Sequence, residues 1–212
     1  MTSRRHLAIA VVALATTTGL VACQGATPDP TDSANPTGSP TETATATPEP
    51  TAGEIPELTP PAFETAQSEE EAIEQAVEAI NAYYVAVSYL YNAHGEHAER
   101  IEDFASGSAL AFQQEEIAGV AEAGNMVEGA PEIVDVITGT AANSEASGQL
   151  VEFGYADMTA CLDVSGYTIT RPDGTEVDLG PQDRGTAQFA ANYYPNTGRW
   201  IVEVEEVVEG TC

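Results

Sequence analysis

The sequence contains no lysine and only six arginines, against thirty-four acidic residues. Its 212 residues therefore carry a formal net charge of −28. Nucleic-acid binding needs clustered Lys and Arg side chains against the phosphates, and an anionic lipid surface repels a chain of this charge. The composition thus excludes nucleic acid as a partner and excludes charge-driven membrane binding. Such acidity is typical of a domain that stays soluble in a salty exterior, and cation binding is the alternative interpretation.

The N-terminus lacks an apolar run long enough to cross a membrane, which takes about 20 residues. The stretch from Leu7 to Leu20 is shorter than that, and threonines interrupt it. Arg4 and Arg5 precede it, and a basic start followed by a short apolar stretch and small residues is typical of a secretory signal peptide. We expect residues 1–22 to be removed on export, through either the general or the twin-arginine route.

Cysteine is scarce as well, with only three in the chain. The first, Cys23, ends the sequence LVAC at residues 20–23, which resembles the lipobox of bacterial lipoproteins. That resemblance implies cleavage before Cys23, a diacylglyceryl group on its sulfur, and anchoring at the outer face of the cytoplasmic membrane. An ordinary cleavage site followed by a chance cysteine is the alternative.

Two cysteines remain once Cys23 is assigned to the lipid, Cys161 and Cys212. Export places them in an oxidising compartment, where a pair of cysteines in one domain favours a disulfide. We expect this bond to attach the C-terminal tail to a strand of the folded domain. Two free or partner-linked thiols are the alternative.

Residues 24–62 contain nine prolines and nine threonines and almost no large apolar side chains. A tract of this composition buries too little surface to offset its ordering entropy. We therefore expect a disordered stalk over residues 23–62. Residues 63–212 are then one domain of a size that can bury a real core.

The first half of this domain has helical periodicity. The sequence SEEE at residues 68–71 reads as a capping box, and apolar residues then recur at three- and four-residue steps to about Ala93. A second helical stretch carries Ile101 and Phe104. A third helix is expected from Ser108 to about Gly124.

The second half has the texture of strands, rich in β-branched and aromatic residues. We expect strands at residues 131–141, 149–164, 184–194 and 199–208. A short hairpin around RPDG should interrupt them. In the second strand, apolar residues change parity, which indicates a bulge near residues 154–157.

Three helices followed by a curved antiparallel sheet predict an α+β domain. Three segments carry a resemblance to a known superfamily: TACLDVSG, RPDGTEV and GRWIVEVEEVVEGTC. In these segments the chain resembles the nuclear transport factor 2-like (cystatin-like) superfamily. It resembles, within that superfamily, uncharacterised actinobacterial lipoproteins. The resemblance implies a bent sheet that wraps the long N-terminal helix into a cone. Cones of this type often form homodimers through the open face of the sheet, so the resemblance also implies that a homodimer is possible.

Some members of that superfamily use a carboxylate and a tyrosine inside the cone. Candidates for such a pocket are Tyr83, Tyr84 and Tyr155 with Asp157, although no motif singles out these positions. The alternative is that the tyrosines pack in the core with a solvated hydroxyl. No phosphate-binding loop or nucleophile elbow occurs in the sequence.

His94 and His97, with acidic residues close by, are the only cluster with metal-ligand character, and they lack a metalloprotease spacing. We interpret them as part of a solvated loop, and we expect no metal and no cofactor.

Two functions follow from the sequence. The first is a non-catalytic lipoprotein whose acidic domain presents a surface to a partner in the cell envelope. The alternative is a small-molecule binder or enzyme that uses the interior of the cone. Fold alone does not choose between them, because one fold hosts many functions.

Overall fold

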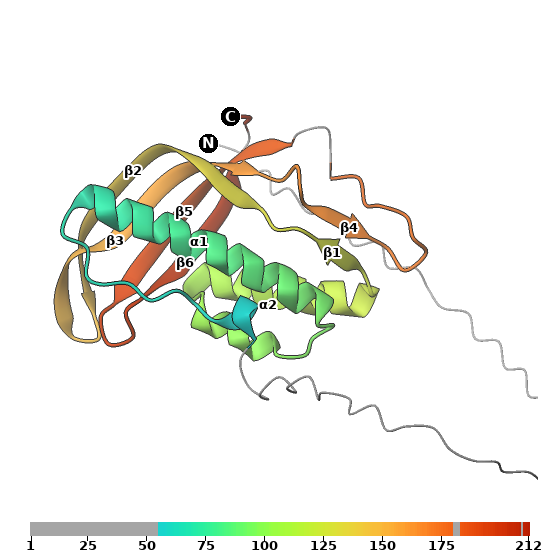
Figure 1. Ribbon diagram of the computed structural model, residues 1–212, viewed down its shortest axis with the longest axis horizontal. Coiled ribbons are helices and arrows are strands. Elements are labelled where there is room, and N and C mark those ends of the chain that lie inside the picture. Colours follow the sequence, from blue (N-terminus) through green and yellow to red (C-terminus); the bar gives the residue numbers. More distant parts are fainter. Residues whose placement is uncertain (1–54, 180–182, 209) are drawn as a thin grey trace, which may run out of the picture. The chain divides into compact units, whose positions relative to one another are not determined.

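The computed structural model describes residues 55–179, 183–208 and 210–212, which belong to one compact unit, Pro50–Cys212. The predicted signal peptide, Cys23 and most of the predicted stalk lie outside these residues. The described part is an α+β domain with helices packed against antiparallel sheets, as the sequence predicts (Figure 1). Its elements are the short 3-10 helices η1 (Pro56–Leu58) and η2 (Ala98–Asp103), the helices α1 (Glu69–Asn92) and α2 (Gly107–Ala123), and the strands β1 (Met126–Glu128), β2 (Glu132–Ala146), β3 (Gln149–Asp163), β4 (Thr168–Thr170), β5 (Arg184–Tyr194) and β6 (Arg199–Val208).

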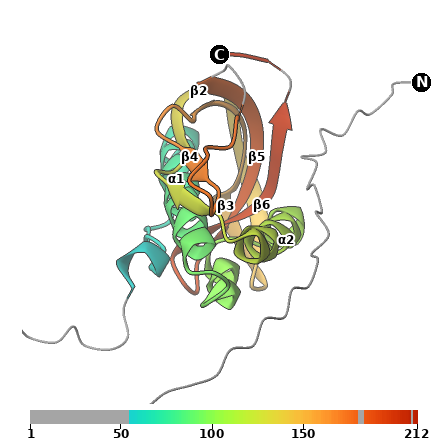
Figure 2. The same ribbon diagram turned by 90° about the vertical axis from the view of Figure 1, so that its right-hand side faces the viewer.

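Four long strands form one antiparallel sheet in the order β2-β3-β5-β6. The short strands β1 and β4 form a separate two-stranded sheet. Helix α1 crosses one face of the large sheet, and α2 lies near β6 (Figures 1 and 2). We call the sheet face toward α1 the inner face and the opposite one the outer face.

Helix α1 begins where its cap predicts. The Ser68 hydroxyl oxygen accepts a hydrogen bond from the Glu71 N–H at 3.1 Å. The Glu71 carboxylate reaches back and accepts from the Gln67 N–H at 2.7 Å. These two bonds satisfy donors that the helix itself leaves unpaired. The side of α1 toward the sheet buries small and large apolar residues: Ala72, Ala76, Ala79, Ile80, Tyr83, Tyr84, Val87 and Leu90.

The core lies between α1 and the inner face of the sheet. On β3 and β5, Met158 and Phe189 are register partners and both are buried. The Tyr84 ring meets the Phe189 ring edge-on, with centroids 6.1 Å apart. On β6, Trp200 is buried and its indole N–H donates to the Gln75 side-chain oxygen at 3.1 Å. Each large apolar side chain buried in this way contributes roughly 1.5–3 kcal/mol, so the inner face is the main source of stability.

The predicted bulge in the second strand lies slightly earlier than expected. The register of β3 with β2 jumps from Val151 to Tyr155, which leaves residues 152–154 outside the ladder. Within them Phe153 has a φ of 52°, in the left-handed region that a bulky residue rarely adopts. Asp157, predicted in the bulge, instead lies in regular register with both β2 and β5.

Packing starts before the predicted domain boundary at residue 63. Leu58, in η1, is fully buried and belongs to the core. Its carbonyl oxygen accepts a hydrogen bond from the Arg100 guanidinium at 2.8 Å. Leu58 and Ile55 are the only large aliphatic residues of a Pro/Thr-rich tract, residues 24–62, so no helical or strand periodicity predicts their burial. The second helical stretch is η2, a single short 3-10 helix that buries Ile101.

Candidate functional site

A polar cluster, in which three buried tyrosines and a buried glutamine surround a half-buried carboxylate, joins α1 and α2 to β6. The Glu205 carboxylate accepts a hydrogen bond from Tyr83 Oη at 2.5 Å and another from Tyr84 Oη at 2.8 Å. It also accepts from the Gln113 side-chain amide at 3.1 Å. The Gln113 oxygen accepts in turn from Tyr91 Oη at 3.0 Å. We call these five residues the Glu205 cluster.

A break in the β6 register turns Glu205 inward. Ala191 pairs with Val202, but the next residue, Ala190, pairs with Val204, so Glu203 is an extra residue. Val202 lies on the inner face before this bulge, and Glu205 lies on that face after it, opposite Phe189. Without the bulge, strict alternation would place Val204 and Glu206 inside. Sequence reasoning named Tyr83 and Tyr84 but missed Glu205 for this reason.

Burial extends into alkali the pH range over which the tyrosines of the cluster stay protonated. Desolvation, followed by the negative charge of Glu205, raises the pKa of Tyr83 and of Tyr84 well above 10. Desolvation also raises the pKa of Tyr91. Nearby on α2, partial burial and the charges of Glu115 and Glu205 raise the pKa of the Glu116 carboxyl. The tyrosine hydroxyls are therefore neutral donors at physiological pH.

The tyrosine donors of the Glu205 cluster are all paired inside it. Each tyrosine hydroxyl in it donates to a named acceptor, and the carboxylate accepts from three donors. Polar groups that satisfy one another in this way rigidify a core and fix a single arrangement of its elements. A catalytic acid or base instead keeps a lone pair or proton free for substrate. The geometry of this cluster therefore favours holding α1, α2 and β6 together over chemistry.

The candidate pocket residues do not meet in one place. Tyr84 is buried against the inner face, whereas Asp157 is exposed and pairs with Ala190 and Thr140 in the sheet. Asp157 alternates with the buried Met158, so its side chain belongs to the outer face. Tyr155 shares that face, and its hydroxyl donates to Asp157 at 3.5 Å. The sheet thus separates Tyr84 from the other two.

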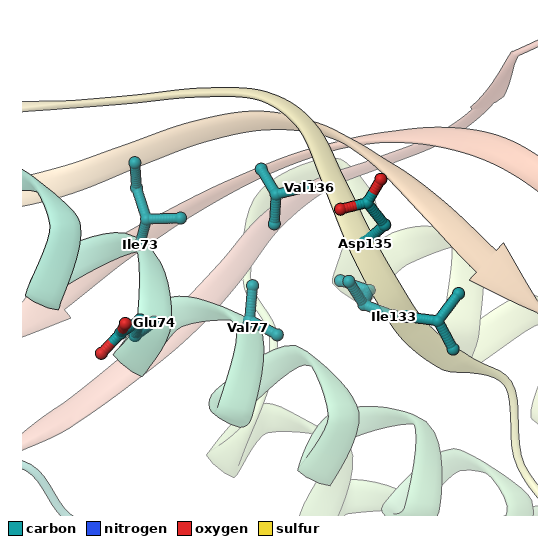
Figure 3. Close-up of a pocket in the computed structure, with 7 residues that line it drawn as sticks. Ile73, Glu74, Val77, Ile133, Asp135 and Val136 are labelled. Carbon is teal, nitrogen blue, oxygen red and sulfur yellow. The ribbon is translucent and has the colours of Figure 1, made fainter. Parts of the chain in front are cut away.

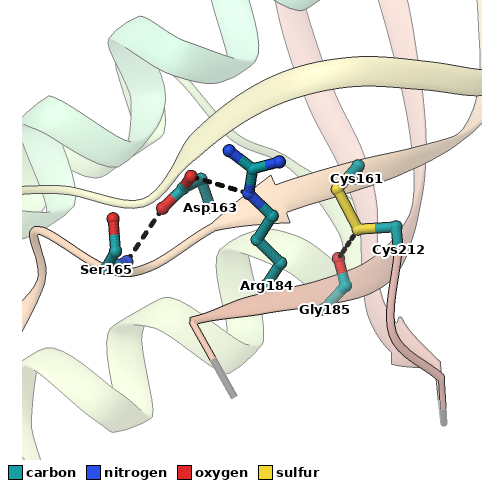
Figure 4. Close-up of a disulfide and its surroundings, with 6 residues drawn as sticks. All are labelled: Cys161, Asp163, Ser165, Arg184, Gly185 and Cys212. Atoms are coloured by element: carbon teal, nitrogen blue, oxygen red, sulfur yellow. Dashed lines mark hydrogen bonds and ion pairs between the residues drawn. A yellow bond between two sulfur atoms is a disulfide. The ribbon is translucent and has the colours of Figure 1, made fainter.

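The predicted disulfide is confirmed. Cys161, late in β3, is bonded to Cys212, and their Cα atoms are 5.6 Å apart (Figure 4). The Cys212 sulfur lies 3.3 Å from the Gly185 carbonyl oxygen of β5. Beside it, Asp163 forms an ion pair with Arg184 at 2.9 Å, and hydrogen bonds from Ser165 and this arginine lower the pKa of the Asp163 carboxyl. The disulfide therefore fastens the C-terminal tail to β3, and the Cys212 sulfur lies next to the neighbouring strand β5.

The depressions on the surface of the described residues include the following two. One, of about 360 Å³, is a groove between α1 and β2, lined by Ile73, Val77, Ile133 and Val136 (Figure 3). The other, of about 290 Å³, lies at the turn between β5 and β6. In that second depression the guanidinium of Arg199 lies 3.6 Å from Asp103. Neither depression reaches the Glu205 cluster through its lining residues.

The two histidines lie in the turn between α1 and η2. His94 and His97 are exposed, and both have backbone φ in the left-handed region. Within the residues that the structure describes, no group of three or more His, Cys, Asp or Glu side chains is arranged to hold a metal ion. The helices of this same part of the chain include none with the length and apolarity needed to span a membrane.

No known family model matches the chain, and no curated protein does. Among solved structures, it is similar to the intermembrane space region of chloroplast protein ARC6, with a TM-score of 0.44 and 11% identity. The match covers 68% of this chain and 100% of that one. A likeness at this level says nothing about activity, so the function has to be argued from the residues themselves.

Proposed function

We propose that the protein is a cell-envelope lipoprotein whose folded domain binds a protein partner and catalyses no reaction. In this proposal residues 1–22 direct export and Cys23 carries the lipid that holds the chain at the outer face of the cytoplasmic membrane. The Thr/Pro-rich tract after Cys23 separates the domain from that membrane. Two or more acyl chains are enough for stable anchoring.

The observation that carries this proposal is the filled inner face with its self-satisfied Glu205 cluster. A small-molecule site needs a concavity with a few polar groups left free to orient the ligand. Here the five residues of the Glu205 cluster are committed to one another, and the two depressions described above lie at the surface. Surface recognition of a partner is the function that such a domain supports best.

Two further observations support the envelope location. A disulfide between Cys161 and Cys212 is typical of an exported domain, because the cytoplasm keeps thiols reduced. The excess of acidic residues is compatible with an exterior in which salt screens self-repulsion. Neither observation identifies the partner.

We also propose that the domain belongs to the nuclear transport factor 2-like superfamily, among actinobacterial lipoproteins. The sequence motifs given above support this, and so does the packing of α1 on one face of an antiparallel sheet. The cone shape and a homodimer through the outer face remain predictions of that resemblance.

The lipid anchor is tested by replacing Cys23 with alanine and fractionating the cells. We expect Cys23→Ala to appear in the medium, because nothing else in the proposal attaches the domain to the membrane. Cys212→Ala is the matched control, since it also removes a cysteine but leaves the anchor, and it should stay in the membrane fraction. Membrane retention of Cys23→Ala would contradict the proposal.

Small-molecule binding inside the domain is the second candidate, and one observation favours it: a carboxylate with two tyrosines at the inner face. Native mass spectrometry of the protein extracted from its own membrane separates the two functions. We expect the mass of the lipidated, oxidised chain with no retained small molecule. A stoichiometric ligand that Glu205→Gln releases would favour the second candidate instead.

A further inference from the structure

The groove between α1 and β2 is apolar along its floor. Ile73 and Val77, one turn apart on α1, point toward β2, and Val136 points back toward the helix (Figure 3). Ile133 extends the same surface along the strand. Val134 adds a side chain that is 44% exposed, because a register shift makes it an extra residue of β2. We call this surface the α1–β2 groove.

The margins of the α1–β2 groove carry negative charge only. Neither α1 nor β2 contains a lysine or an arginine. On α1 the exposed residues Glu70, Glu74 and Glu78 recur every four positions, in a row beside Ile73 and Val77. On the strand side Asp135 is exposed and lines the groove. An apolar floor with acidic margins complements a ligand that joins apolar side chains to positive charge.

The groove is left open by the rest of the domain. β2 is one of the two edge strands of the large sheet, and no other strand of the described residues pairs with its free side. Two of its backbone N–H groups on that side are covered by α1 side chains: Ile133 donates to Asn81 at 2.8 Å and Ala141 to Glu69 at 3.1 Å. Three register shifts further distort the strand. These features discourage indiscriminate strand addition and leave the side chains of the groove as the recognition surface.

We propose that the α1–β2 groove binds a cationic amphipathic segment of a partner protein. Its apolar side chains fill the space between Ile73, Val77 and Val136, and its lysines or arginines pair with Glu74 and Asp135. A second copy of this chain is a poor occupant, because it brings the same excess of negative charge. The inference rests on the proposed function, for which it names the binding surface and the chemistry of the partner.

The probe is a fluorescein-labelled synthetic peptide of about twelve residues that alternates valine and lysine. Its binding to the mature full-length chain is measured by fluorescence anisotropy at fixed salt. We expect it to bind at least about tenfold more tightly than a peptide with serine in place of valine, because only the first fills the groove. Equal affinities would overturn the proposal, since charge alone would then explain the binding. Failure of the valine–lysine peptide to bind would also overturn it.

Matched charge variants locate the binding. Glu74→Gln combined with Asp135→Asn removes two charges from the groove, and Glu115→Gln combined with Glu122→Gln removes two exposed charges from α2. All four positions lie at the surface apart from the core, so the fold should persist, which circular dichroism checks. We expect the groove pair to weaken peptide binding at least about fivefold and the α2 pair less than about twofold. Equal weakening by both pairs would overturn the groove as the site.

Photo-crosslinking in cells separates this inference from the proposed function. A photoreactive amino acid is introduced at Val134 or, as the control, at Leu150, which is 77% exposed on β3. We expect a protein adduct of discrete mass from position 134 that the valine–lysine peptide competes away, and none from position 150. An adduct from position 150 alone would overturn the groove and leave the proposed function standing. The absence of an adduct at both positions would contradict the groove, and its absence at a wider set of surface positions would contradict the proposed function as well.

Discussion

Glu205 is a single carboxylate on which two helices depend. Tyr83 and Tyr84 are adjacent on α1, yet both hydroxyls reach the same side chain of β6, and Gln113 reaches it from α2. Hydrogen bonds to a charged acceptor contribute more than neutral ones, roughly 1.5–3 kcal/mol each. A residue that looks like one more surface glutamate in the acidic sequence VEVEEVV is therefore half-buried and bonded to buried side chains of both helices.

Replacing this carboxylate with an amide should destabilise the domain. In Glu205→Gln one oxygen acceptor remains for three donors, so we expect a loss of about 1–3 kcal/mol in the free energy of unfolding, measured by urea denaturation. Glu206→Gln is the matched control, because the neighbouring side chain is exposed on the outer face, and it should change stability by less than about 0.5 kcal/mol. Equal stability of the two variants would show that the Glu205 cluster contributes nothing.

At the scale of elements, the β2–β3 hairpin shows how local backbone chemistry fixes register. Its two-residue turn, Ser147-Gly148, has positive φ at both positions, 55° and 74°. Two-residue turns of this kind match the twist of the strands, and they favour Asn-Gly because asparagine tolerates the left-handed region better than serine. Ser147 is therefore held in a backbone conformation that serine disfavours.

The variant Ser147→Asn should stabilise the hairpin. It relieves backbone strain at an exposed site and loses only the exposed hydrogen bond from Ser147 to Asn196. We expect a gain of about 0.5–1 kcal/mol in the free energy of unfolding, visible as a higher thermal midpoint. Ser147→Val is the opposite control and should lower the midpoint, since β-branched residues resist positive φ. A lower midpoint for Ser147→Asn would refute this account of the turn.

Element types followed from the sequence because their signals are local. Ser68 and Glu71 predict the start of α1, and the alternation of apolar and polar residues predicts the long strands. Which side chains of a strand face the core could not be predicted in the same way. One inserted residue, such as Glu203, reverses which side chains face inward. A change of parity among apolar residues indicates the bulge in β3, but no such change was predicted for β2 or β6. Glu205 and the α1–β2 groove, with its extra residue Val134, both depend on bulges and so were not predicted.

For the whole molecule, the disulfide is the main covalent constraint. It joins residues 51 apart in sequence, and the loss of chain entropy in the unfolded state corresponds to about 4 kcal/mol for a loop of this length, as an upper figure. Cys161→Ser with Cys212→Ser should therefore lower the free energy of unfolding by up to that amount in urea denaturation. A reductant should reproduce the effect on the unmodified chain and leave the double variant unchanged. A double variant as stable as the oxidised chain would contradict this role.

The buried tyrosines make the whole domain sensitive to alkali. Burial raises the pKa of Tyr83, Tyr84 and Tyr91 above their value near 10 in an unfolded chain. Their contribution to stability is complete below pH 10 and is lost as the pH rises further, because the unfolded state then releases protons that the folded state keeps. We expect cooperative unfolding above pH 10, with tyrosinate absorbance and loss of circular dichroism in one step. Smooth ionisation of all eight tyrosines with native circular dichroism would contradict it.

The same bond between Cys161 and Cys212 sets how far the molecule extends under mechanical load. When the two ends of the domain are pulled apart, the closed loop keeps β5 and β6 from lengthening the chain, even after every strand has separated. The disulfide bypasses the residues between Cys161 and Cys212. At about 3.5 Å per extended residue, this shortens the fully extended chain by roughly 180 Å. A domain pulled between its N-terminal side and its C-terminal tail would therefore extend less by this length than the same domain after reduction.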